Sequence, residues 1–111
     1  MQWSDQMRRH LEIVPKRRGR LFEALVKRES ELADRNRGTF FRSGRKSKNA
    51  ARWRHKKYVG WLKITRIAGE VVSVDVNTRS RRGADWQLLQ AFIGFVVRNF
   101  ADHVEAMHIR F

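Results

Sequence analysis

The chain has 111 residues, the size of one domain, and a formal net charge of +14. Four Trp and seven Phe exclude a wholly disordered basic tail, because such tails lack large apolar groups. The absence of cysteine excludes a disulfide framework, a cysteine-based zinc site and a thiol nucleophile, and no apolar run reaches the roughly 18 residues of a membrane span. We therefore expect one domain over residues 1–111, without a cofactor or a membrane partner, in a reducing cytoplasm.

Residues 1–19 predict a short N-terminal helix or arm that is followed by a basic turn. Ser4 and Asp5 can cap a helix at its N-terminus. Apolar residues then recur at helical spacing on one side: Trp3, Met7, Leu11 and Val14. Pro15 ends this helix or bends its exit, and a loosely docked arm is the alternative.

Residues 20–111 are expected to form an α/β core that begins with a second helix over about residues 20–35. Its apolar stripe includes Leu21, Leu25 and Leu32, and Gly38 follows the end of the helix. Residues 39–42 are a short β-prone piece. Residues 43–51 are polar and predict a loop.

Residues 56–66 and 70–78 predict a β-hairpin. Val72, Val74 and Val76 alternate with polar residues, which is typical of a strand with one buried face. A three-residue loop over residues 67–69 would pair residues whose numbers sum to 136, so that Leu62 faces Val74. The opposite face would then carry Trp61, Lys63, Thr65, Val71, Ser73 and Asp75.

Residues 84–102 predict a long helix whose apolar surface is wider than one stripe. Leu89 belongs to the apolar side that is expected to face the core, and Leu88, Phe95 and Val97 extend this apolar surface around the helix. We therefore expect a second buried side, covered by a homodimer partner or a partner subunit. Residues 104–111 predict a last strand by alternation, while a continued helix stays open as the alternative.

The expected fold class is therefore α+β. The order is an N-terminal helix or helices, a three-stranded antiparallel meander, the long apolar helix and a C-terminal strand (αβββαβ). The last strand would return parallel to the sheet through a right-handed crossover.

A positively charged run dominates the functional signal. Residues 35–67 contain no Asp or Glu, and large aromatic residues are interleaved with their Arg and Lys side chains. Such a run repels itself and is normally stabilised by a polyanion, most commonly nucleic acid. The predicted nucleic-acid-binding residues are nine cations of this run, three cations of the next basic turn and one aromatic residue: Arg42, Arg45, Lys46, Lys48, Arg52, Arg54, Lys56, Lys57, Trp61, Lys63, Arg79, Arg81 and Arg82.

The start of the long helix resembles a double-stranded RNA-binding domain. In that family a Ser, two basic residues, any residue, an Ala and a Lys begin the second helix, and its cations grip groove phosphates. Ser80, Arg81, Arg82 and Ala84 match, whereas Asp85 stands where the family has Lys. The glycines before the motif are also missing. The resemblance covers about residues 20–101 and implies binding of structured RNA.

The expected element order is also similar to the core of restriction-endonuclease-like nucleases. Glu70 and Asp75 look like their third-strand acids, and Glu23 like the first-helix acid. Asn77 replaces the motif's Lys, and the second strand lacks its metal-binding Asp. Because two-metal chemistry needs clustered carboxylates, this resemblance implies a dead active site.

Together these patterns favour a small non-catalytic RNA- or DNA-binding protein, with structured RNA preferred over DNA. The alternatives are a basic nuclease, metal-free or restriction-endonuclease-like, and an interaction subunit that docks a partner through residues 84–102. Four histidines, His10, His55, His103 and His108, would supply the acid and base of metal-free RNA cleavage. No catalytic or metal-binding residue is assigned.

Overall fold

The computed structural model describes residues 7–79 and 83–110. In chain order the elements are β1 (Met7–Pro15), α1 (Leu21–Asp34), β2 (Phe40–Arg42), β3 (Ala50–His55), β4 (Trp61–Arg66), β5 (Val72–Thr78), α2 (Ala84–Phe100) and β6 (Val104–Arg110). The six strands form one sheet in the order β2-β3-β4-β5-β1-β6, and all neighbouring pairs are antiparallel. The class is α+β, with strands dominating.

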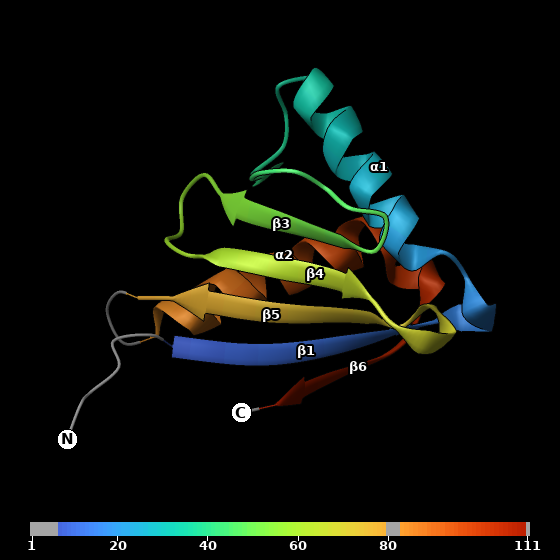
Figure 1. Ribbon diagram of the computed structural model, residues 1–111. Coiled ribbons are helices and arrows are strands. Elements are labelled where there is room, and N and C mark those ends of the chain that lie inside the picture. The colour runs from blue at the N-terminus through green and yellow to red at the C-terminus, as the bar shows by residue number, and fades with distance from the viewer. Residues whose placement is uncertain (1–6, 80–82, 111) are drawn as a thin grey trace.

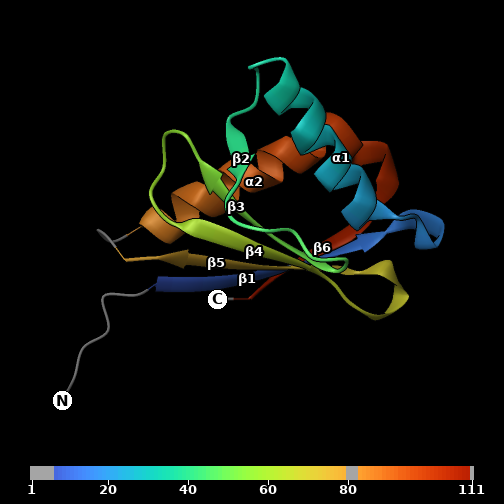
Figure 2. The same cartoon turned by 45° about the horizontal axis from the view of Figure 1, so that its top comes forward.

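Both helices lie on the same side of the sheet (Figures 1 and 2). Helix α2 packs on β1 and β5, and α1 leans across β2 and β4. The opposite side of the sheet, which we call the open face, carries no helix among the described residues. Neither of the two described helices combines the length and apolar character that a membrane span needs.

The core lies between the helices and the sheet. Alternate residues of the central strands are fully buried in it: Leu11, Ile13, Leu62, Ile64, Val72, Val74 and Val76. An aromatic cluster closes the core at the β2–β3 side, where Trp53 contacts Phe40, Phe92 and Phe95 with ring centroids 5.4–5.9 Å apart. Tilted and edge-on aromatic pairs of this kind add to the burial energy of the rings themselves.

The predicted N-terminal helix is wrong over Met7–Pro15, which forms strand β1, while Trp3, Ser4 and Asp5 lie outside the described residues. Strand β1 pairs with β5 on one edge and β6 on the other, so its backbone polar groups are satisfied by two distant strands. Leu11 and Ile13 alternate into the core, a period of two that helical spacing does not accommodate. The helical spacing of Met7, Leu11 and Val14 was coincidental.

The predicted three-stranded meander is also wrong, because four strands lie between the helices. Strand β3 overlaps the end of the loop expected over residues 43–51, and in it Ala51 and Trp53 point inward while Arg52 and Arg54 point outward. The β4–β5 pairing sums to 138, with Leu62 opposite Val76, so the expected register is two residues off. A shift of two leaves every side chain on its expected face.

The last strand is not a parallel neighbour of the meander. Strand β6 runs in the same direction as β5, but β1 lies between them and pairs antiparallel with both. The αβββαβ order is therefore replaced by β1-α1-β2-β3-β4-β5-α2-β6. Strand β1 in place of the N-terminal helix and the additional strand β3 account for the difference.

The second apolar side of α2 is covered mainly from within the chain. Leu88 is fully buried and Phe95 packs against Phe40 of β2, while Arg28 of α1 donates to Asn99 of α2 at 3.1 Å. Val97 remains 51% exposed. This arrangement removes the physical reason that the sequence offered for a dimer or a partner subunit on α2.

Candidate nucleic-acid interface on the open sheet face

Strict alternation places the polar residues of β3 and β4 on the open face. Trp53 and Leu62 point into the core, so Arg52, Lys63 and Trp61 point away from the helices. Arg52 and Lys63 are Cα partners across the two strands, and Lys63 is the partner of Asp75 on β5. The alternation of β3 and β4 therefore directs the apolar residues of the run into the core and its cations to solvent.

Five exposed cations gather on this part of the sheet around Trp61: Arg45, Arg52, Arg54, Lys63 and Arg79. None of the five makes an ion pair within residues 7–79 and 83–110. We call these five cations and Trp61 the basic half of the open face. Its positive charge is thus not neutralised inside the described part of the chain.

Trp61 lies within the basic half and is partly exposed. The guanidinium carbon of Arg52 lies 4.2 Å from the centroid of its ring, a cation–π stack. A hollow of about 410 Å³ lies beside Trp61 and is also lined by Arg54, Asn77 and Arg79. A second hollow of about 310 Å³ is lined by Arg45, Arg52 and Lys63. The stacked ring and cations are therefore next to open space.

Gly60 lets the chain pass close to β5 just before Trp61. Its φ of +104° lies in the region that favours glycine. A Cβ at this position would collide with the backbone oxygen of Asn77 and with the Thr78 side chain. The close approach holds the start of β4 against the end of β5, where the hollow beside Trp61 forms.

His55 orders the loop that leads to Gly60. Its Nδ1 accepts the backbone N–H groups of Lys57 at 2.9 Å and Tyr58 at 3.3 Å, and its ring stacks on Tyr58. Burial and the nearby charge of Lys57 lower the pKa of His55, which keeps the ring neutral and able to accept. This histidine has a structural role in the β3–β4 loop.

The other part of the open face, on β5, β1 and β6, has a different charge pattern. His10 Nδ1 lies 2.8 Å from Asp75 Oδ1, and its Nε2 lies 3.0 Å from Glu12 Oε2. Arg110 of β6 is 3.7 Å from the same Glu12 carboxylate. We call these four residues the charge-balanced half, because each cation here has an acidic partner.

The carboxylates favour a protonated His10. Burial lowers the pKa of His10, but hydrogen bonds to Asp75 and Glu12 and their charges outweigh it, so the pKa is raised. The hydrogen bond from His10, aided by Arg110, lowers the pKa of Glu12. The charge-balanced half is therefore a closed network.

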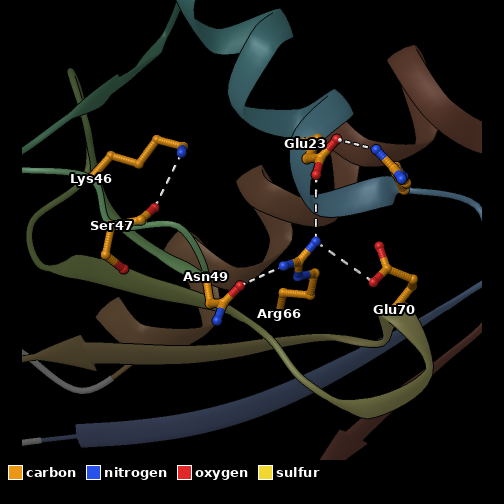
Figure 3. Close-up of polar contacts among 7 residues, drawn as sticks. Glu23, Lys46, Ser47, Asn49, Arg66 and Glu70 are labelled. Carbon is orange, nitrogen blue, oxygen red and sulfur yellow. Dashed lines mark hydrogen bonds and ion pairs between the residues drawn. The ribbon is translucent and has the colours of Figure 1, made fainter.

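Arg66 fixes the loop that carries Arg45 (Figure 3). Its Nη2 donates to Asn49 Oδ1 at 2.6 Å, and its backbone N–H donates to the Asn49 carbonyl at 2.7 Å. Its Nη1 also lies 3.4 Å from Glu23 of α1 and 3.7 Å from Glu70. One guanidinium thus ties together α1, the β2–β3 loop and the β4–β5 turn.

The remaining predicted binding residues lie away from the basic half or outside the described residues. Arg42 is on edge strand β2, where its backbone N–H donates a hydrogen bond to the Glu29 carboxylate. Burial raises the pKa of Glu29, and this effect outweighs the charge of Arg42, which lowers it. Lys46 reaches over Phe22 of α1, with 5.8 Å from Nζ to the ring centroid. Lys48 is exposed in the β2–β3 loop, and Lys56 and Lys57 belong to the β3–β4 loop. Arg81 and Arg82, with Ser80, lie outside the described residues.

Two open-face residues were missed from the sequence. Arg8 of β1 lines a hollow of about 350 Å³ together with Lys63, Asp75 and Asn77. Arg8 was missed because β1 was assigned to a helix, and the alternation of Leu11 and Ile13 was the signal that would have found it. Asn77 was considered only as a departure from a nuclease motif.

The acids considered for a nuclease site fall into two separate networks. Asp75 is held by His10, while Glu23 and Glu70 both pair with Arg66. Within the described ranges, no group of three or more His, Asp or Glu side chains could hold a metal ion. These carboxylates therefore do not form the cluster that two-metal phosphodiester chemistry requires.

A scan of protein-family models and searches of curated proteins and of solved structures find no match to this chain.

Proposed function

We propose that this protein binds nucleic acid through the basic half of its open sheet face, without catalysing a reaction. The observation that carries the proposal is the set of five exposed cations, gathered around Trp61, that make no ion pair with any described residue. Such cations repel one another and are stabilised by a polyanion. Four of the five are Arg, whose planar fork suits phosphate oxygens.

The spacing of these cations suits a nucleic-acid backbone. Outward residues of one strand are about 6.6 Å apart, and neighbouring strands lie about 4.8 Å apart. A nucleic-acid strand carries one charge per ~3.4 Å of helix axis. Arg52, Arg54 and Lys63 therefore form a grid on which several phosphates can be neutralised together.

Structured RNA and an exposed single strand share this phosphate contact. The short motif of Ser80, Arg81, Arg82 and Ala84, which resembles that of double-stranded RNA-binding domains, favours structured RNA, although four strands and not three lie between the helices. The position of Trp61 among the cations supports an unpaired strand, because paired bases offer no face for stacking. The first experiment therefore measures the phosphate contact alone.

The test is fluorescence anisotropy with a labelled RNA hairpin and a labelled single strand, titrated at several salt concentrations. If about six phosphates are contacted, affinity should fall by roughly 10³-fold between ~50 and ~200 mM salt. Arg52→Glu with Lys63→Glu should weaken binding by about 10²-fold or more and reduce the salt slope by about 2.

The matched control is Lys27→Glu with Arg98→Glu. These residues are exposed on α1 and α2, on the other side of the sheet, and the net charge changes by the same amount. We expect only a small loss of affinity, from long-range electrostatics. A flat salt response, or equal losses in the two double variants, would reject the proposed interface.

A further inference from the structure

The hollow beside Trp61 has a polar wall as well as a basic rim. Asn77 is only 8% exposed, yet it lines this hollow and the neighbouring one beside Arg8. No hydrogen bond within the described residues involves its side-chain amide. The amide of Asn77 is not among the fully buried, unpaired polar atoms of the described residues, so it reaches the solvent in the hollow, where a ligand can replace water as its hydrogen-bond partner.

The chemistry of the walls is specific. The Asn77 amide offers both a donor and an acceptor, as the edge of a nucleobase does. The Trp61 ring, with Arg52 over it, also lines the hollow, where it offers an aromatic surface to a flat partner. Arg54 and Arg79 line the same hollow, and neither makes an ion pair with another residue that the structure describes. Its volume of about 410 Å³ is within the range of small-ligand sites.

We infer that this hollow takes one unpaired nucleobase of a single-stranded RNA or DNA. The base stacks on Trp61, its polar edge contacts Asn77, and its flanking phosphates lie at Arg54 and Arg79. A paired base has its polar edge occupied and both faces stacked, so only a single strand or an unpaired loop can fill the site. The inference rests on the proposed function and deepens it, because it names the kind of strand that is bound.

The experiment compares two strands with the same number of phosphates. One is an oligothymidine of about 12 nucleotides, within the ~4–16 nucleotides that small single-strand-binding folds cover. The other is a fully abasic strand of the same length, and a blunt duplex serves as a third probe. All are titrated by anisotropy against the full chain and four variants: Trp61→Ala, Trp61→Phe, Asn77→Ser and Trp86→Phe.

We expect the wild-type protein to bind the oligothymidine about tenfold more tightly than the abasic strand, the value of one base stack. Trp61→Ala should remove this difference, whereas Trp61→Phe, which keeps an aromatic face, should retain most of it. Asn77→Ser should weaken binding of the base-bearing strand alone by a few fold. Trp86→Phe on α2 is the control and should change neither affinity.

Two kinds of failure are distinguishable. Equal affinity of the wild-type protein for both strands, or tighter binding of the duplex, would overturn the base site and leave the proposed function intact. Absence of binding to all three probes would overturn the proposed function and the base site together.

Discussion

The two faces of strands β3 and β4 carry similar residues in different roles. Trp53 on the covered face is fully buried among Phe40, Phe92 and Phe95, whereas Trp61 on the open face is partly exposed under Arg52. The two tryptophans come from the same acid-free run. The face to which each residue points, and not its type, separates the core from the candidate interface.

The largest expected effect is on the covered face. Trp53→Ala should lower the free energy of unfolding by about 3–5 kcal/mol, because it empties the centre of the aromatic cluster. Trp61→Ala should change it by less than about 1 kcal/mol, because that ring is at the surface. Denaturant unfolding of both variants is the measurement. Similar losses in the two would show that the faces do not divide stability from binding.

A smaller effect is expected at Arg66, which positions the β2–β3 loop behind the basic half. Arg66→Ala should cost about 1 kcal/mol, because its bonds to Asn49 and Glu23 are partly exposed. Amide hydrogen exchange of residues 43–49 should accelerate in this variant. Arg20→Ala removes another ion pair to Glu23 from a highly exposed side chain and should leave that exchange unchanged.

The charge-balanced half predicts a modest pH dependence of stability. Because the pKa of His10 is raised, its contribution is complete below the ordinary value of 6.5 and is lost as pH rises through the folded-state pKa. Because the pKa of Glu12 is lowered, its contribution is complete above 4.5 and is lost as pH falls through the folded-state pKa. Both contributions are therefore present between these two values.

His10→Asn tests this pH window. The difference in melting temperature between wild type and variant should be largest near about pH 5.5 and shrink toward about pH 9. It should correspond to less than about 1 kcal/mol, since the network is at the surface. His103→Asn serves as the control, because His103 contacts Phe100 and not a carboxylate. A pH-independent difference would mean that the His10 network adds no charge-dependent stability.

The smallest expected effect is on phosphodiester cleavage. Mg²⁺ or Mn²⁺ should leave bound RNA and DNA intact, because Asp75 is separated from Glu23 and Glu70 in another network. Gel analysis of labelled strands over several hours is the measurement. Metal-dependent cutting that disappears in Asp75→Ala would restore the nuclease interpretation.

Patterns within single segments predicted the two helices and the buried faces of β4 and β5. Residues 20–35 and 84–102 are close to α1 and α2, because an amphipathic stripe and helix-ending residues act within one element. The faces of β4 and β5 follow from alternation, even though the register differs by two residues. The alternation in residues 50–55 was equally strong and was overlooked.

The rest of the fold depends on pairing between distant segments. Strand β1 is stabilised by β5 and β6, which lie far along the chain, and nothing within residues 7–15 identifies them as partners. The candidate interface is likewise divided into residues that local sequence reveals and residues that only the strand order reveals. Arg52, Arg54, Trp61 and Lys63 were predicted from the run itself. The inclusion of Arg8 and Asn77, by contrast, follows from the strand order of the sheet.

The place of β1 in the sheet also bears on biosynthesis. This strand leaves the ribosome before every other described element, yet it occupies the fifth position of six, between β5 and β6. At ~5–20 residues per second, β1 waits roughly 3–12 s for β5 to be translated, and longer for β6. The nascent chain therefore holds a strand with one apolar face and two unpaired edges until its C-terminal third has emerged.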